Sequence, residues 1–368
     1  MVIPKMLSLQ EQLFNSSILN LQLNDSNPKW NLRSFYHTQK PYQESLDYRN
    51  LPVAELIIGT VTYIIIIVIT IVGNSLVVIS VFSYRPLKKA QNYFLVSLAA
   101  SDLCVATFVM PLHVAKFIAG GQWLLGMTLC HIFTTADIML CTSSILNLCA
   151  IALDRYWAIH DPLNYVHKRT LKFVCQTIAV VWLASACISV PPVIGWNDWS
   201  GESLKTHCEL TTEKAFVVYS ASGSFFVPLV VMVIVYVKIF LAARQRIRTN
   251  RNYTDKHSEH ATNALRQRAQ ISVSKEKRAA KTIAVIIFVF SFCWLPFFSA
   301  YVILPFCNSC YLHPKIMQAF VWLGYINSSL NPFLYGILNM EFRRAFGKIL
   351  CPKLVHLNRR MNSHRNKL

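Results

Sequence analysis

The stretch LIIGTVTYIIIIVITIVGNSLVVISVF, from Leu56 to Phe82, is the clearest indication of the fold. It runs for 27 residues without a charged side chain. A helix needs about 20 apolar residues to cross a bilayer core of roughly 30 Å, so this stretch predicts a membrane-spanning helix. Six more apolar stretches follow, at Asn92–Phe117, Met127–Ile159, Phe173–Gly195, Lys214–Ala243, Lys275–Leu304 and Pro314–Leu338. The sequence therefore predicts an all-α membrane protein, a bundle of seven transmembrane helices.

The composition and the charge agree with a membrane protein. Of 368 residues 54% are hydrophobic and 14% are charged, whereas soluble chains carry about 25% charged residues. The net charge of +19 raises the alternative of nucleic-acid binding. If the C-terminus is cytoplasmic and the N-terminus outside, however, 27 of the 36 Lys and Arg residues fall on inner segments. The positive-inside rule expects this asymmetry, so we expect a multi-pass plasma-membrane protein whose basic residues meet membrane lipids and no nucleic acid.

Three regions follow from this topology. Residues 1–55 form a polar outer tail that we expect to be disordered, with glycosylation sequons at Asn15 and Asn24. Residues 56–338 hold the spans, with a basic inner loop at 244–274 that should be mobile. Residues 339–368 form a cytoplasmic tail. Its stretch Glu341–Cys351 alternates basic and apolar residues as a short amphipathic eighth helix would, and Cys351 is a candidate for palmitoylation.

Ionisable residues at membrane depth are costly and usually functional. Asp102 lies in the second predicted span, Asp137 lies in the third, and the third span ends on Asp154, Arg155 and Tyr156. We expect no Lys or Arg at the depth of Asp137, which favours a cationic ligand over an internal partner for its carboxylate. Aromatic rings that could surround such a cation are Trp294, Phe297, Phe298, Tyr301, Trp322 and Tyr325.

Hydroxyl and thiol groups complete the candidate residues. Ser220 and Ser224 are four residues apart, so both should lie on one face of the fifth span. They could bond a ligand hydroxyl or their own helix carbonyls. Cys130 and Cys208 fall outside the membrane, where a disulfide between them would persist. Cys307 and Cys310 could bridge each other, the alternative being a metal site with His313; we expect no structural metal.

Short motifs in chain order now indicate a family. They are Gly73-Asn74, LAASD ending in Asp102, Asp154-Arg155-Tyr156, Trp182, Pro228, FSFCWLP from Phe290 to Pro296, and NPFLY from Asn331 to Tyr335. One motif would be weak, but all of them, one per span, are highly specific. From Leu56 to Cys351 the chain resembles class A (rhodopsin-like) G-protein-coupled receptors.

The resemblance narrows to biogenic-amine receptors. GWNDW at Gly195–Trp199, YSASGSFFVPL at Tyr219–Leu229 and YVILPFC at Tyr301–Cys307 look most like invertebrate tyramine and octopamine receptors. Ala221 stands where catecholamine receptors have a second adjacent serine, which disfavours dopamine. The resemblance implies that Asp137 binds an amine and that Trp294 is the toggle of activation. The implied ligand site is Asp137, Ile138, Cys141, Ser220, Ser224, Trp294, Phe297, Phe298, Tyr301, Trp322 and Tyr325.

The same resemblance implies coupling at the inner face. Arg155 should pair with Asp154 and with Glu276 at the base of the sixth span, and Leu163 should pack against the G protein. Heterotrimeric G protein of the inhibitory type, arrestin and a receptor kinase are the implied partners. No cofactor is implied beyond an allosteric Na⁺ held by Asp102, Asn74, Ser144, Asn327 and Asn331. The remaining implied activation residues are Tyr156, Pro332 and Tyr335.

Other functions remain as alternatives. A serotonin, dopamine or adrenergic-like receptor would keep the fold and Asp137. A channel or transporter could use Asp102 and Asp137 as a polar path, but the spans show no inverted repeat. A retinal photoreceptor would need a Schiff-base lysine in the seventh span, and Tyr325 stands there instead. An enzyme is not expected, because no nucleophile, base or metal motif is visible.

Overall fold

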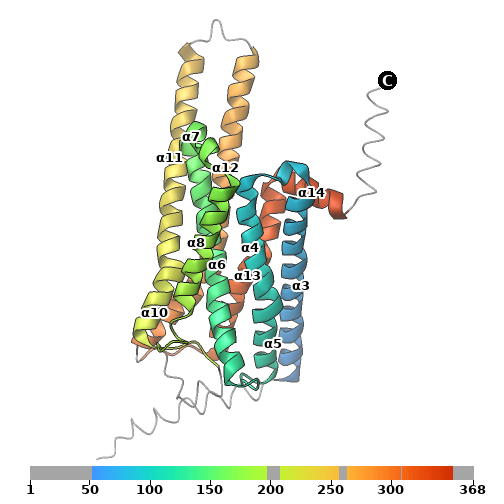
Figure 1. Cartoon of the computed structure of the whole chain (residues 1–368), viewed down its shortest axis with the longest axis vertical. Helices are drawn as coiled ribbons and strands as arrows, with labels where there is room; N and C mark the ends of the chain where they lie inside the picture. Colours follow the sequence, from blue (N-terminus) through green and yellow to red (C-terminus); the bar gives the residue numbers. More distant parts are fainter. Residues whose placement is uncertain (1–51, 197–207, 257–262, 308, 351–368) are drawn as a thin grey trace, which may run out of the picture. The chain divides into compact units, whose positions relative to one another are not determined.

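The computed structural model describes residues 52–196, 208–256, 263–307 and 309–350. Within these ranges the regular structure is entirely helical (Figure 1). The predicted glycosylation sites Asn15 and Asn24 and the candidate lipidation site Cys351 lie outside the described residues.

The spans are built from nine α-helices and two π-helical turns among the described residues. The first span is α3 (Val53–Ser83), and the second is α4 (Tyr93–Cys104), η3 (Val105–Val109) and α5 (Met110–Ile118). The third is α6 (Met127–His160) and the fourth α8 (Leu171–Ser189). The fifth is α10 (Lys214–Ala221), η4 (Ser222–Phe226) and α11 (Val227–Lys256), the sixth α12 (Asn263–Phe306) and the seventh α13 (Pro314–Leu338).

Short helices lie between and after the spans. Two 3₁₀ turns, η1 (Arg85–Leu87) and η2 (Ala90–Asn92), connect the first span to the second, and α7 (Pro162–Lys168) connects the third to the fourth. The predicted amphipathic helix is α14 (Met340–Leu350). It buries Phe342 and Ala345, and the ring of Phe342 lies 5.8 Å from that of Tyr335. Arg343, Arg344 and Lys348 are exposed on it.

Six helices of the described part are long and apolar enough to cross a membrane, and α13 is not among them. Its 25 residues include the buried polar side chains Asn327, Ser328, Ser329 and Asn331, which lower its hydropathy. The polar residues of α13 face the interior of the bundle, as intramembrane polar groups usually do. By contrast, α3 exposes a row of Ile and Val side chains, as a helix that contacts lipid would.

Two predicted boundaries differ from the structure. The fourth span ends at Ser189 rather than at Gly195, because Pro191 and Pro192 follow and cannot continue the helical hydrogen bonds. The fifth and sixth helices also extend into the segment predicted as a loop at 244–274, to Lys256 and from Asn263. Hydropathy detects only the part of a helix inside the membrane, whereas Arg, Gln, Lys and Ala continue a helix well in water.

The third helix is the centre of the bundle. It packs against α4, α8 and α11, while α13 packs against α12 and α3 (Figure 1). Glycines permit the closest of these contacts. A Cβ on Gly324 would lie 2.7 Å from the ring of Trp294, and one on Gly73 would lie 2.9 Å from Pro332. Trp294 of α12 and Pro332 of α13 therefore pack closely against α13 and α3, because Gly324 and Gly73 have no side chain there.

Candidate functional site

Asp137 lies on α6, and its carboxylate has polar neighbours on three helices, α5, α6 and α13. Its Oδ1 accepts a hydrogen bond of 3.0 Å from the phenol of Tyr325 on α13, and one of 3.4 Å from the thiol of Cys141 on α6 itself. Its Oδ2 lies 3.8 Å from Nε2 of His113 on α5. The Asp137 side chain is 16% exposed, so the carboxylate is enclosed but reachable. A partly buried carboxylate with one oxygen not fully engaged is suited to a cationic ligand.

His113 is the internal neighbour that the sequence analysis missed. We expected no Lys or Arg at the depth of Asp137 and did not consider histidine. No local pattern in the sequence pairs His113 with Asp137, and the π-helical turn η3 between Asp102 and His113 breaks the simple α-helical spacing. Lys116, one turn beyond His113, donates a hydrogen bond of 3.3 Å to the carbonyl of Cys208 and so belongs to the outer end of the site.

Aromatic rings of α12 form one contiguous group. Phe297 contacts Trp294, Phe298 and Tyr301 with ring centroids 5.2 to 6.1 Å apart. Phe298 also stacks at 4.6 Å on Phe225 of η4. Trp294 packs beside Gly324, whose neighbour in sequence is Tyr325, the hydrogen-bond donor to Asp137. The α12 rings are therefore linked to Asp137 indirectly, through Gly324 and Tyr325 of α13.

Trp322 lies on another side of the same region. Its ring stacks at 3.8 Å on Tyr63 of α3 and lies edge-on to Tyr325 at 5.5 Å. It is 3% exposed. In the structure Trp322 joins α13 to α3 and packs against Tyr325.

The two serines of the fifth span contact different helices. The hydroxyl of Ser220 lies 3.3 Å from that of Tyr301 on α12 and 3.4 Å from its own helix carbonyl at Val217. The hydroxyl of Ser224 lies 2.8 Å from that of Thr142 on α6. We expected one shared face from the four-residue spacing. The π-helical turn η4 begins between them and has a wider turn than an α-helix, so the expected offset does not hold.

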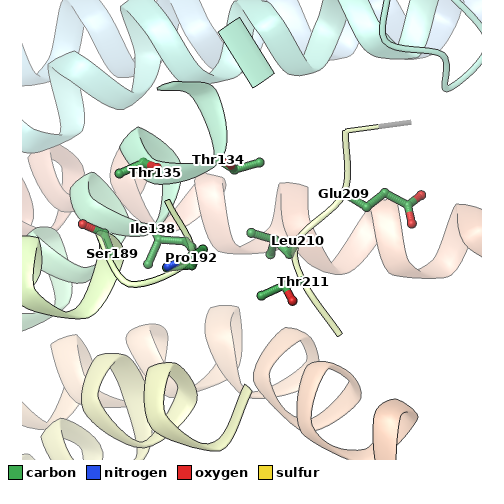
Figure 2. Close-up of a pocket in the computed structure, with 8 residues that line it drawn as sticks. All are labelled: Thr134, Thr135, Ile138, Ser189, Pro192, Glu209, Leu210 and Thr211. Atoms are coloured by element: carbon green, nitrogen blue, oxygen red, sulfur yellow. The ribbon is translucent and has the colours of Figure 1, made fainter. Parts of the chain in front are cut away.

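A small hollow opens at the outer end of α6 (Figure 2). It is lined by Thr134, Thr135, Ile138, Ser189, Pro192, Glu209, Leu210 and Thr211. Ile138 follows Asp137 and is the only predicted site residue that lines it. The disulfide between Cys130 and Cys208, with an S–S distance of 2.02 Å, holds residues 209–211 over α6. This bridge was the signal in the sequence that could have located Glu209.

A second disulfide joins Cys307 and Cys310 at 1.98 Å, between α12 and α13. Both thiols are therefore used, which removes the metal site with His313 that we had considered. Among the described residues no cluster of His, Cys, Asp or Glu has the geometry of a metal site.

The polar group around Asp102 includes only part of the predicted set. Ser144 donates a hydrogen bond of 2.8 Å to Oδ1 of Asp102, and Asn331 donates one of 2.8 Å to Oδ2. Asn74 donates instead to the carbonyls of Thr70 and Ser328, which ties α3 to α13. Asn327 is buried on α13. The Oδ1 of Asn74 is buried and has no hydrogen-bond partner in the described part of the chain.

The inner end of α6 differs from the implied arrangement. Asp154 accepts a hydrogen bond of 3.1 Å from Tyr165 and lies 3.3 Å from the guanidinium of Arg169, so its ion pair is with Arg169 rather than with Arg155. Adjacent helical residues point about 100° apart, which explains why Asp154 and Arg155 face different neighbours. Burial and the nearby carboxylate of Asp154 raise the pKa of Tyr165, so the phenol remains a donor.

The other activation residues are placed as follows. Tyr156 packs tilted against Trp157, Pro332 and Tyr335 are buried on α13, and Arg155 is half-buried on α6. Leu163 lies on α7 and Glu276 on α12, but their side chains are outside the described part. The pairing of Arg155 with Glu276 therefore stays a prediction.

The amino-acid sequence is similar to that of known proteins. Residues 73–335 match the family model described as 7 transmembrane receptor (rhodopsin family). The chain is 57% identical to tyramine receptor Ser-2 of Caenorhabditis elegans, over 83% of this chain and 86% of that protein. It is 37% identical to an octopamine receptor of Heliothis virescens, over 82% and 90% of the two chains. It is 35% identical to 5-hydroxytryptamine receptor 1D of Homo sapiens, over 83% and 92%.

Proposed function

The chain belongs to the rhodopsin family of seven-transmembrane receptors, and on that premise we propose that it is a G-protein-coupled receptor for a phenolic biogenic amine. Tyramine is the first candidate and octopamine the second. The relative with 57% identity is a tyramine receptor, and octopamine receptors are 37% identical. A 5-hydroxytryptamine receptor at 35% identity makes serotonin a weaker candidate.

The observation that carries this proposal is the environment of Asp137. Tyr325 holds one carboxylate oxygen by a hydrogen bond of 3.0 Å and leaves the other facing His113 at 3.8 Å. A ligand ammonium can pair with this second oxygen in an enclosed region of low dielectric, where a charge-assisted bond is stronger than in water. Aromatic faces nearby would add cation–π attraction of about 1–2 kcal/mol.

The hydroxyl groups support a phenol rather than a catechol. Ser220 is bonded weakly, at 3.3 and 3.4 Å, and so can exchange its partners for a ligand hydroxyl. Ser224 is already bonded to Thr142 at 2.8 Å, and Ala221 offers no hydroxyl. One available serine matches the single phenolic hydroxyl of tyramine or octopamine. The ring of the ligand would lie against Phe297 and Phe298.

Signal transmission requires two helix packings that the ligand binds unequally. We infer that contacts to Ser220 on α10 and to the α12 rings bias the position of α12 relative to α6. Pro296 and Pro332 lie inside α12 and α13 and weaken their hydrogen bonding where those helices would move. The proposed topology has the N-terminus outside and the C-terminus cytoplasmic, which puts Arg155, Tyr156, Leu163 and Glu276 on the side of the G protein. By linkage, G protein should raise agonist affinity.

The other partners belong to the same proposal. Inhibitory-type G protein, arrestin and a receptor kinase would bind the inner face. A Na⁺ ion fits the oxygen-rich group of Asp102, Ser144 and Asn74, whose Oδ1 lacks a partner in the described part. Asn331 is less suited, because its amide nitrogen faces Asp102. If bound, such an ion would supply positive charge to the buried carboxylate.

A signalling assay tests the proposed function. Cells that express the chain would be exposed to tyramine, octopamine, dopamine and serotonin, and cyclic AMP and calcium would be measured. We expect tyramine or octopamine to act at the lowest dose, and Asp137→Ala to abolish the response. A lowest effective dose for dopamine or serotonin would reject the phenolic ligand. Silence toward all four with confirmed surface expression would reject the amine receptor.

A further inference from the structure

The two carboxylate oxygens of Asp137 have different surroundings. Oδ1 accepts hydrogen bonds from Tyr325 and from Cys141. In the described part of the chain, Oδ2 has His113 as its polar neighbour, with Nε2 at 3.8 Å. That distance is too long for a hydrogen bond. A ligand ammonium that pairs with Asp137 therefore has most access at Oδ2, where it would lie beside the imidazole.

The ring of His113 is held in this position from two sides. It lies edge-on to Phe133 of α6 with centroids 5.0 Å apart, and edge-on to Tyr325 of α13 at 5.3 Å. The side chain is 19% exposed, so it borders the same enclosed space as Asp137. These two ring contacts hold the imidazole beside the carboxylate. Its charge state therefore acts directly on whatever occupies the space between them.

Other titratable groups lie around His113 on the helices packed against it. They are the phenol of Tyr325, the carboxylate of Asp137 and, one turn outward on α5, the ammonium of Lys116, which binds the carbonyl of Cys208. Tyr63 of α3 packs on Phe117 near the same level, and Glu209 is exposed beyond the disulfide. Among these groups and His113, histidine is the type whose charge ordinarily changes in mildly acidic medium.

We propose that His113 is a second residue of the amine site, which accepts a hydrogen bond from the ligand ammonium when neutral and displaces the ligand from Asp137 when protonated. This inference rests on the proposed function. A neutral imidazole and the carboxylate together form an acceptor pair for the N–H groups of an ammonium. An imidazolium instead pairs with Asp137 and repels the incoming cation.

The expected consequence is a loss of amine affinity on acidification. Histidine is the side chain whose charge ordinarily changes in mildly acidic medium. If only the neutral form binds, the apparent affinity falls in proportion to the neutral fraction as the pH is lowered. Amine ligands keep their own charge in such a medium, so their protonation does not contribute.

The experiment is saturation binding of radiolabelled tyramine at pH 7.5, 6.5 and 5.5, on membranes from cells that express the full chain. His113→Gln keeps a polar group toward Asp137 that cannot become charged. His113→Phe keeps the ring packing on Phe133 and Tyr325 and is the second variant. His131→Gln on α6 is the matched control, because it removes another histidine of the outer half of the bundle. Surface labelling verifies that each variant is folded and exported.

The wild type and His131→Gln should lose affinity from pH 7.5 to 5.5, and both His113 variants should lose less than about twofold. A loss equal to that of the wild type in His113→Gln and His113→Phe would overturn the role of His113, and so would a pH-independent wild type. Each of these results still shows tyramine binding at pH 7.5 and leaves the proposed function intact. Absence of saturable binding by the wild type at pH 7.5 would instead overturn the proposed function and, with it, this inference.

Discussion

Ser224 and Thr142 share a hydrogen bond of 2.8 Å between their hydroxyls, which joins the fifth span to the third. Ser220 precedes the π-helical turn η4 in the chain, and its hydroxyl faces that of Tyr301 on α12 instead. One serine therefore holds two helices together, while the other is only weakly bonded where a ligand would lie. Ser220 and Ser224 are both serines of the fifth span, but their surroundings differ in the structure. Mutation should therefore separate their roles.

Ser220→Ala should weaken tyramine binding, because it removes the hydroxyl that is available to the phenol. A hydrogen bond of this kind contributes about 0.5–1.5 kcal/mol, so the dissociation constant should rise by roughly threefold to tenfold. Ser224→Ala should lower the melting temperature of the detergent-solubilised receptor while changing affinity less. Radioligand binding and thermal unfolding measure the two effects. A larger affinity loss in Ser224→Ala than in Ser220→Ala would contradict this assignment.

Tyr325→Phe should lower amine affinity without removing the aromatic ring. The phenol donates to Oδ1 of Asp137 at 3.0 Å, and a hydrogen bond to a charged group contributes about 1.5–3 kcal/mol. We expect a loss of at least about tenfold in tyramine affinity. Tyr219→Phe is the matched control, because that hydroxyl donates to the carbonyl of Cys187 on an exposed surface. Equal effects of the two substitutions would mean that the bond to Asp137 is not used in binding.

Gly324→Ala should alter the resting state of the receptor. The added Cβ would lie within 2.9 Å of three atoms of the Trp294 ring, so the ring must move or the helices must separate. Overpacking of this kind costs about 1–3 kcal/mol. Basal signalling and thermal stability should both differ from wild type. The double variant Gly324→Ala with Trp294→Phe should recover stability, since the smaller ring lacks the contacting atoms. If the double variant did not recover stability, the destabilisation would not come from contact between the added Cβ at position 324 and the Trp294 ring.

Arg169→Ala should destabilise the inner end of α6 and raise signalling without agonist. It leaves the buried carboxylate of Asp154 with Tyr165 as its remaining described partner. Loss of one partner of a buried charge costs about 1–3 kcal/mol. Lys168→Ala, which removes an exposed neighbouring charge, is the control. Unfolding temperature and basal cyclic AMP report the two effects, and a variant indistinguishable from Lys168→Ala would show that the pair is dispensable.

Much of the fold was predictable, because hydropathy and motif order depend on local sequence. The seventh span, predicted as an apolar stretch, has the bounds observed for α13, Pro314–Leu338. The extension of α11 to Lys256 was not found, because charged residues end a hydropathy signal but not a helix. The partners of individual polar groups depend on tertiary packing. His113 beside Asp137, Thr142 beside Ser224 and Arg169 beside Asp154 each join residues whose pairing no local pattern encodes.

The proposed function depends on an ion pair between Asp137 and the ammonium of a phenolic amine. Saturation binding of radiolabelled tyramine to wild type and Asp137→Asn, matched for surface expression, measures the contribution of this pair. Asn keeps the size of the side chain and removes the charge. An ion pair in an enclosed site is expected to contribute about 3–5 kcal/mol once one partner is removed, so Asp137→Asn should bind tyramine at least about a hundredfold more weakly. Affinity of Asp137→Asn within about threefold of wild type would contradict the account.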